Sequence, residues 1–416
     1  MRRQPPPEAG YTATHKHELF PWWGGSKDQQ KETAVNAQDS TTIGLDLGNT
    51  FTKAVGLDAR GNVVLREDLH NDAETLKAFF EAHPGATVGM ETGTHCRWIA
   101  ALAASCGCDA VIGNARKLRL ISESSRKNDW NDAESIARLC RFDRKLFHPV
   151  TLRDGEHHRL YQLLRQRDAL VSMRTALVNQ LRGFAKAGGT MLPRRDARSF
   201  LSLRDSMPPE FLRDFKPLLK ALEDLARRIA AAEAILGQFV RRHFRKMDER
   251  LQTVPGVGPV ASAAFIALVP DPGRFKSARE AGPYFGLVPK QDQSGDGHRP
   301  CRITHEGSPF MRKTLVNAAN ALLKKSARDT ALKRFGERLS RRGQGKVARR
   351  KAKVALARKL AVTMLAMMRR GEDYRDAPAP EPAAPDAHRG AKRLKRISAT
   401  VVRQGRFHGN RHFPAA

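Results

Sequence analysis

The stretch that decides the fold runs from Thr42 to Asp58 and reads T-I-G-L-D-L-G-N-T-F-T-K-A-V-G-L-D. Apolar residues alternate with small or polar ones on both sides of Gly48-Asn49, which predicts two antiparallel strands joined by a tight turn. Asp46 lies in the first strand among apolar neighbours, where a carboxylate is costly to ionise unless a positive charge meets it. A bound metal, or a nucleotide phosphate with its Mg²⁺, would supply that charge. The other interpretation is a turn aspartate that caps its own loop.

The composition indicates a polyanionic partner. The 416 residues, enough for two or three domains, include 74 Lys and Arg against 43 Asp and Glu, a formal net charge of +31. This excess attracts polyanions, and the low aromatic content of 6% favours nucleic acid over an aromatic-caged ligand. We find no run of 18 apolar residues and no signal-peptide core, and therefore expect a soluble, cytoplasmic protein without a membrane segment. The five cysteines lack zinc-type spacing, and we expect reduced thiols.

Residues 41–150 show an α/β pattern, preceded by residues 1–40, which have no periodicity and are expected to form a disordered arm. Beyond the opening hairpin, strands are predicted at 62–65, 86–90 and 109–112, and helices at 73–82, 94–104 and from 132 onward. Three leading strands followed by alternating helices and strands predict an RNase H-like α/β domain. In such sheets the chemistry lies at strand ends.

Four carboxylates occupy the positions where that chemistry is expected. Asp46 lies in the first strand, Glu91 follows the strand at 86–90, and K-N-D-W-N-D-A carries Asp129 and Asp132. The spacing of three puts Asp129 and Asp132 on one face of a helix start. Helix capping would explain Asp132 alone, but two carboxylates on one face repel, and a cation shared with Asp46 would remove that cost. Such oxygen ligands suit Mg²⁺ or Mn²⁺, and two-metal sites serve phosphodiester chemistry.

Residues 151–251 are predicted to form a helical, coiled-coil-like segment. Leu163, Leu170 and Leu177 are spaced by seven, and apolar residues from Leu218 to Phe239 alternate by fours and threes. One interpretation is a basic stalk or dimer contact that holds nucleic acid. The other is an intramolecular helical hairpin with a solvated face.

Residues 252–370 are predicted to form a mainly α C-terminal domain. Pro255-Gly-Val-Gly258 is typical of a helix-hairpin-helix turn, whose N–H groups can meet a phosphate, although a purely structural turn has the same pattern. Ser294 lies in a polar, glycine-rich loop. Four basic residues close in sequence are candidates for holding phosphate: His298, Arg302, His305 and Arg312.

A basic stretch follows, with twelve Lys or Arg from Lys333 to Lys359 against one acidic residue, Glu337. This density predicts binding to the phosphate backbone, with an affinity that falls with salt. Residues 371–416 contain a Pro/Ala linker and a basic tail that we expect to be disordered.

Taken together, these motifs resemble the DEDD-type insertion-sequence transposases, recombinases with a RuvC-like N-terminal domain and a serine-bearing C-terminal domain that are guided by a bridge RNA. The matching pieces cover roughly residues 41–370 in the expected order. They are D-L-G-N-T at Asp46, E-T-G at Glu91, K-N-D-W-N-D-A at Asp129 and Asp132, P-G-V-G-P at Pro255, F-K-S-A-R at Phe275, G-L-V-P at Gly286 and Q-S-G at Ser294.

The resemblance implies a DNA recombinase in which Asp46, Glu91, Asp129 and Asp132 bind Mg²⁺. It also implies that Ser294 attacks a DNA phosphate and forms a covalent phosphoserine intermediate. The implied partners are the DNA of the element ends and target, a noncoding guide RNA, and further copies of this chain in a dimer or tetramer.

Three other classes fit parts of the sequence. G-L-D-L-G-N-T also resembles the first phosphate loop of actin-like and sugar kinases, but these need a second D-x-G-G-type loop, and this chain is too basic for a metabolite kinase. A Holliday-junction resolvase would use the same carboxylates without serine chemistry and is normally shorter. A non-enzymatic nucleic-acid-binding protein would leave the four carboxylates unexplained.

Overall fold

The computed structural model describes residues 41–115, 117–118, 128–290, 302–343 and 345–376, together with the backbone of 293–294 and 297–298. The predicted arm at 1–40 and the chain from 377 onward, which holds the basic tail, lie outside the described residues. The chain divides into two compact units, residues 1–155 and 156–416, and each is described by itself. Within the described residues, no helix combines the length and the apolar character needed to cross a membrane.

A mixed five-stranded sheet forms the centre of the first unit, in the order β3-β2-β1-β4-β5. The strands are β1 (Thr42–Leu47), β2 (Phe51–Leu57), β3 (Val63–His70), β4 (Thr87–Glu91) and β5 (Asp109–Gly113). β1, β2 and β3 pair antiparallel, whereas β4 pairs parallel with both β1 and β5. The predicted opening hairpin is confirmed, and this arrangement is compatible with an RNase H-like N-terminal domain.

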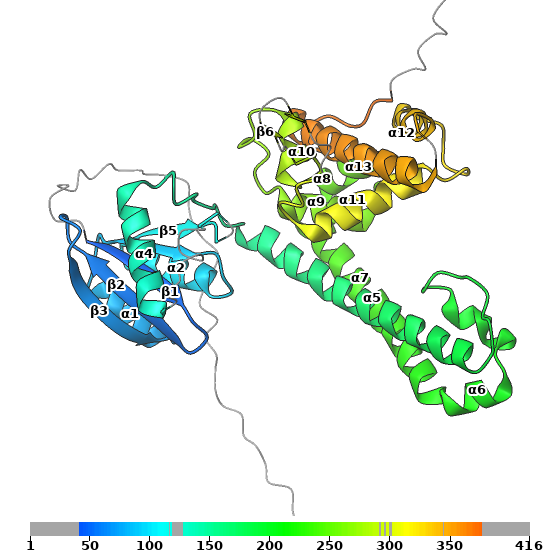
Figure 1. Ribbon diagram of the computed structural model, residues 1–416, viewed down its shortest axis with the longest axis horizontal. Helices are drawn as coiled ribbons and strands as arrows, with labels where there is room; N and C mark the ends of the chain where they lie inside the picture. The colour runs from blue at the N-terminus through cyan, green and yellow to red at the C-terminus, as the bar shows by residue number, and fades with distance from the viewer. Residues whose placement is uncertain are drawn as a thin grey trace, which may run out of the picture. The chain divides into compact units, whose positions relative to one another are not determined.

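Helices cover both faces of the sheet. Figure 1 shows α4 (Asp129–Phe142) against one face, with α1 (Ala73–Glu81) and α2 (Cys96–Ser105) on the other. The α1/α2 face holds the larger apolar core, which includes Ile43, Leu45, Leu76, Phe80, Met90 and Ile99. The α4 face holds a smaller one, formed by Val111, Leu118, Ile136, Cys140 and Phe147.

Two predicted boundaries in this unit were wrong. β3 extends to His70 rather than ending at residue 65, because its charged residues pair across the sheet, as in the ion pair of Lys53 with Asp68. α4 begins at Asp129 rather than at residue 132, because the side chain of Asn128 caps the helix by accepting from the backbone N–H of Trp130 at 3.1 Å.

The backbones of α4 and β1 pack in direct contact at Gly44. A Cβ at Gly44 would overlap the carbonyl oxygen of Ala133 and the backbone nitrogen of Ala137, so the helix backbone rests directly on the strand. Gly89, the β4 partner of Gly44, extends the contact, since a Cβ there would lie 3.0 Å from that of Cys140. Two adjacent glycines therefore create the groove that seats α4.

The second unit begins with a helical hairpin. Its elements are α5 (Gly155–Ala187), η1 (Phe200–Ser206), α6 (Pro209–Asp214) and α7 (Lys216–His243). Residues from all four form one apolar cluster, and Arg167 of α5 pairs with Glu233 of α7 at 2.6 Å. The intramolecular hairpin interpretation is thus observed, whereas the coiled-coil dimer contact stays a prediction.

The rest of the second unit is mainly helical. It contains α8 (Arg245–Gln252), α9 (Pro259–Leu268), η2 (Ala278–Glu280), α10 (Ala281–Tyr284), α11 (Pro309–Leu322), α12 (Ala331–Arg341) and α13 (Gly345–Arg370). The buried helix α9 and one face of α13 share a core that includes Phe265, Phe285, Leu315, Leu356 and Met364. The P-G-V-G sequence forms the turn between α8 and α9, and its helix-hairpin-helix role stays a prediction.

Substitution Gly44→Ala should destabilise the first unit by ~1–3 kcal/mol or more, because the new methyl group meets backbone atoms that cannot rotate away. Urea unfolding followed by tryptophan fluorescence measures this, since all four tryptophans precede residue 156. Gly93→Ala is the matched control, because a Cβ there meets nothing within 4 Å. Equal unfolding midpoints for the two variants would contradict the packing argument.

Candidate active site

Strand pairing brings Asp46 and Glu91 together. β1 and β4 run parallel with Leu45 opposite Met90, so Asp46 and Glu91 are the next residues in register. Both point to the α4 face, since side chains alternate along a strand and Gly44 and Gly89 two residues earlier contact α4. The two carboxyl groups therefore lie side by side at the carboxyl ends of neighbouring strands.

The first turn of α4 supplies the other two carboxylates. Because α4 crosses β1 at Gly44, its N-terminus lies over the end of the strand where Asp46 stands. Asp129 and Asp132 both fall in this turn. The side-chain cap of the helix is Asn128, so capping does not account for Asp129 or Asp132.

The electrostatics of the carboxyl groups reflect this proximity. Burial, followed by repulsion from Asp132 and then Asp129, raises the pKa of Asp46 from its ordinary 3.8 to about 6. The pKa of Glu91 is also raised, first by burial and then by Asp46 and Asp132. The structure thus brings the four predicted residues into one mutually repelling cluster.

A neighbouring lysine does not neutralise this cluster. Lys53 of β2 stands directly opposite Asp46 in the antiparallel register. Its ammonium group is instead paired with Asp68 of β3 and lies 5.1 Å from the ring centroid of Trp130. Sequence reasoning missed both Lys53 and Trp130. Alternation puts Phe51 and Lys53 on the face of Asp46, but a two-residue turn at Gly48-Asn49 would have placed Phe51 opposite Asp46, whereas the observed loop is longer and places Lys53 there.

The donor set fits a hard divalent cation, although the ligand geometry is not formed. Carboxylate oxygens are the ligands that Mg²⁺ and Mn²⁺ prefer, and a cation would relieve the repulsion that raises the pKa of Asp46. Among the described residues, however, no three His, Cys, Asp or Glu side chains converge closely enough to hold a metal ion as they stand.

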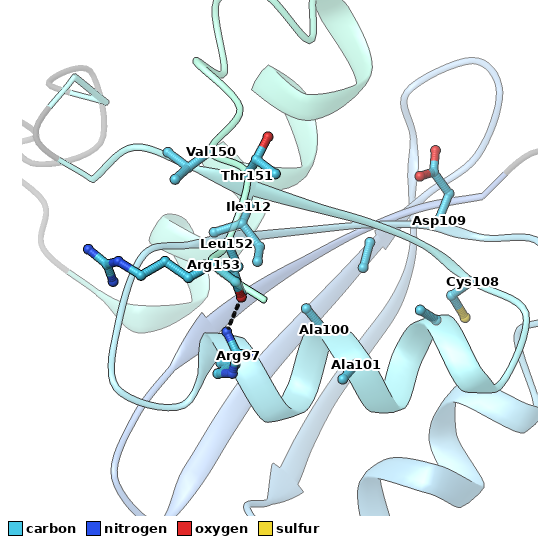
Figure 2. Close-up of a pocket in the computed structure, with 12 residues that line it drawn as sticks. Arg97, Ala100, Ala101, Cys108, Asp109, Ile112, Val150, Thr151, Leu152 and Arg153 are labelled. Carbon is cyan, nitrogen blue, oxygen red and sulfur yellow. Dashed lines mark hydrogen bonds between the residues drawn. The ribbon is translucent and has the colours of Figure 1, made fainter. Parts of the chain in front are cut away.

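A cavity of about 640 Å³ in the first unit lies elsewhere, between α2 and residues 150–153. Figure 2 shows Ala100 and Ala101 on its α2 wall and Arg97 at one end, where the guanidinium donates to the carbonyl oxygen of Arg153 at 2.6 Å. None of the four carboxylates lines this cavity. The candidate site therefore lies outside this cavity, at the carboxyl ends of β1 and β4.

Ser294 belongs to the second unit. The backbone of β6 (Gln293–Ser294) pairs antiparallel with that of β7 (Gly297–His298). Residues 288–290 pair with 302–304, since Lys290 N–H donates to Arg302 O at 2.8 Å. The backbone around Ser294 is thus part of a β-hairpin rather than an irregular loop. The side chain of Ser294 lies outside the described part of the chain, and its role as nucleophile stays a prediction.

The base of this hairpin is fixed by Gly286 and Arg312. Gly286 has a φ of +64°, and a Cβ there would overlap the backbone of Glu306. The guanidinium of Arg312, a predicted phosphate ligand, donates to the carbonyl oxygens of Phe285 and Gly307 at 3.3 Å. Arg312 therefore has a structural task at the hairpin base. Phosphate binding by the other three predicted residues stays untested.

Comparisons with known proteins point to one family. Residues 43–187 match a DEDD transposase model of the IS110 group, described as "Transposase". Residues 248–335 match a model described as "Transposase IS116/IS110/IS902 family".

Several curated relatives that match this chain over most of their length are also named as transposases. The "Probable family 20 transposase" of Pseudomonas aeruginosa is 28% identical over 356 residues, which are 80% of this chain and 98% of the relative. The "Transposase for insertion sequence element IS1111A" of Coxiella burnetii is 26% identical, over 83% of this chain and 94% of the relative. The "Transposase for insertion sequence element IS1328" of Yersinia enterocolitica is 27% identical, over 77% of this chain and 94% of the relative.

The acidic strand ends lie within the first matched region, and the second matched region contains β6 with Ser294. With both regions present in order, and with full-length relatives named as transposases of insertion sequences, this chain belongs to the IS110/IS116 family of insertion-sequence transposases.

Proposed function

We propose that this transposase cleaves and rejoins DNA strands at the cluster of Asp46, Glu91, Asp129 and Asp132, in a reaction that depends on Mg²⁺, for which Mn²⁺ can substitute. The observation that carries the proposal is the meeting of these carboxylates at two parallel strand ends and one helix start. The names of the curated relatives support DNA of an insertion sequence as the substrate.

In this proposal the four carboxylates hold the cation and set its position relative to the DNA phosphate. When bound, the metal supplies a Lewis acid for the phosphate and lowers the pKa of the attacking hydroxyl group. The strands β1 and β4 fix Asp46 and Glu91, and the contact at Gly44 fixes the helix that carries Asp129 and Asp132. The chain thereby brings the elements that carry its donors close together before substrate binds.

Ser294 is proposed as the nucleophile. Its hydroxyl oxygen would bond to phosphorus while one phosphodiester P–O bond breaks, and the DNA end that leaves would become a hydroxyl group by taking up the proton that the serine loses. The resulting phosphoserine would conserve the energy of the broken bond for rejoining. The hairpin that carries Ser294 is braced at its base by Arg312, which supports a fixed position for the attacking residue.

The proposed partners follow from the family and from the charge. We propose a homodimer or tetramer on DNA in the cytoplasm, with a noncoding RNA that selects the target by base pairing while the protein contacts backbone and shape. A resolvase-like endonuclease without serine chemistry is the alternative, since the same four carboxylates would serve it.

The basic stretch of the second unit is proposed to bind the nucleic-acid backbone. Lys346, Arg349 and Arg350 are exposed at the start of α13. Lys333 is different, because its ammonium group is buried and donates to the carbonyl oxygens of Lys325 and Ala327, at 3.4 and 2.7 Å. The stretch therefore combines surface cations with one structural lysine.

Exchange of Asp46 for Asn should raise the thermal unfolding midpoint in EDTA at pH 7.5. The pKa of Asp46 is about 6 in the folded protein, against its ordinary value of 3.8 in the unfolded chain. Between about pH 4 and 6 the folded protein therefore holds a proton that the unfolded chain has released. The stability of the wild type therefore falls as pH rises through this window. The difference in unfolding midpoint between Asp46→Asn and the wild type should therefore increase as pH rises. Millimolar Mg²⁺ should raise the midpoint of the wild type more than that of Asp46→Asn.

Glu67→Gln is the matched control, because Glu67 is exposed on β3 and points to the opposite face. We expect it to change neither the pH dependence nor the response to Mg²⁺. If Asp46→Asn were no more stable than the wild type at pH 7.5, the repulsion in the cluster would be too weak to favour a cation.

The proposed function is tested by an excision assay in cells with the flanking DNA of the element, for wild type, Asp46→Asn and Ser294→Ala. Circular excision product is expected from the wild type alone, and a protein–DNA adduct on denaturing gels should be absent with Ser294→Ala. Product that survives loss of Ser294 but not of Asp46 would favour the resolvase-like alternative. Product without Asp46 would refute the metal-site assignment.

The double variant Arg349→Ala/Arg350→Ala should weaken binding to duplex DNA and lower the slope of log affinity against log salt by up to about 2. Lys333→Met should instead lower stability, because it leaves two carbonyl oxygens without their donor, and should leave the slope of the folded protein unchanged. Fluorescence anisotropy over a salt series separates the two effects. Identical slopes for wild type and the arginine double variant would place the phosphate contacts elsewhere.

A further inference from the structure

The register of β1, β2 and β3 places an aromatic side chain beside the acidic cluster. Residues directly opposite each other on antiparallel strands share a face. Asp46, Lys53 and Asp68 therefore form one row on the α4 face, and Phe51 and His70 form the next. Phe51 is the diagonal neighbour of Asp46, a relation that puts their Cα atoms about 7–8 Å apart.

Phe51 is unusually open for an aromatic residue. Half of its surface is exposed, and its ring meets that of His70 edge-to-face, with centroids 5.3 Å apart and an interplanar angle of 87°. A perpendicular contact leaves at least one face of the Phe51 ring uncovered by His70. The other large apolar side chains that are exposed among the described residues of this unit are Val64, Phe142 and Leu146. Phe51 is the one in the row next to Asp46.

The two polar side chains nearest Phe51 in the strand register, Lys53 and His70, are already used within the protein. Lys53 is held between Asp68 and the ring of Trp130. His70 Nδ1 lies 2.8 Å from Asp72, which leaves the ring of His70 fixed against Phe51. What the surface beside the carboxylates offers a ligand is therefore an aromatic face in a fixed orientation.

We propose that Phe51 is a stacking platform for an unpaired DNA base next to the phosphate bound at the acidic cluster. This inference rests on the proposed function, because it assumes that the four carboxylates hold a DNA phosphate through a cation. A base inside a duplex is stacked on both sides, so the platform selects DNA that is locally open, as at a junction or during strand exchange. Stacking on an aromatic ring is sequence-tolerant, since every base has a π-face.

The test uses the full-length chain in the Asp46→Asn background and a single-stranded 12-mer of alternating thymidine and 2-aminopurine. Stacking on Phe51 should quench the 2-aminopurine fluorescence on binding. Phe51→Leu keeps an apolar side chain without a π-face, and should lower both the quenching and the affinity, the latter roughly 5- to 100-fold. Phe51→Trp should retain both, which excludes a folding defect as the cause.

Phe142→Leu is the matched control, because Phe142 is 80% exposed at the far end of α4. The stacking role of Phe51 would be supported if Phe51→Leu lost both quenching and affinity while Phe51→Trp and Phe142→Leu retained them. Equal quenching by the parent and Phe51→Leu would overturn it. Dependence on Phe51 with an oligoribonucleotide of the same design but not with DNA would overturn the assignment to DNA. Cleavage of the 12-mer, checked on a gel, would refute the role of Asp46 while the quenching still decides the platform.

Discussion

The cluster of four carboxylates depends on one steric constraint, the contact of the α4 backbone with β1 at Gly44. Any side chain at Gly44 would push the helix off the sheet, because the obstructing atoms belong to the backbone of Ala133 and Ala137. The same contact sets the height of the first turn of α4 above the end of β1. The proximity of Asp129 and Asp132 to Asp46 is thus a consequence of a missing Cβ two residues earlier in the strand.

This packing has an electrostatic cost. It gathers half-buried carboxylates, raises the pKa of Asp46 to about 6, and leaves Lys53, the residue opposite Asp46, paired with Asp68. A protein selected for stability alone would turn Lys53 toward Asp46. A cation that completes the site would explain this arrangement. Its attraction to the carboxylates would supply the favourable interaction that the folded chain lacks without an ion pair between Lys53 and Asp46.

Much of this site could be predicted from sequence, because alternation around Gly48-Asn49 fixes which residues of β1 and β2 share a face. The extension of β3 to His70 could not be predicted, because its charged residues are typical of a loop. Only the ion pair of Asp68 with Lys53 in the structure explains why they lie in a strand. The platform at Phe51 was missed for the same reason, as its partner His70 lies in that extension. Likewise, Lys333 belongs to a basic run by composition, and only its buried contacts show a structural role.

The groups that border the cluster bear on how a target is chosen. Asn71 donates to the carbonyl oxygen of Gly48 and accepts from Thr52, and the side chains of Lys53 and His70 contact Asp68 and Asp72. Several hydrogen-bonding side chains at this end of the described sheet are thus already engaged within the protein. In the proposal, DNA is then held by carboxylates that bind phosphate through a cation and by a ring that accepts any base. A site that worked in this way would not read sequence, so target choice would have to come from outside it, which is the task that the proposal gives to a guide RNA.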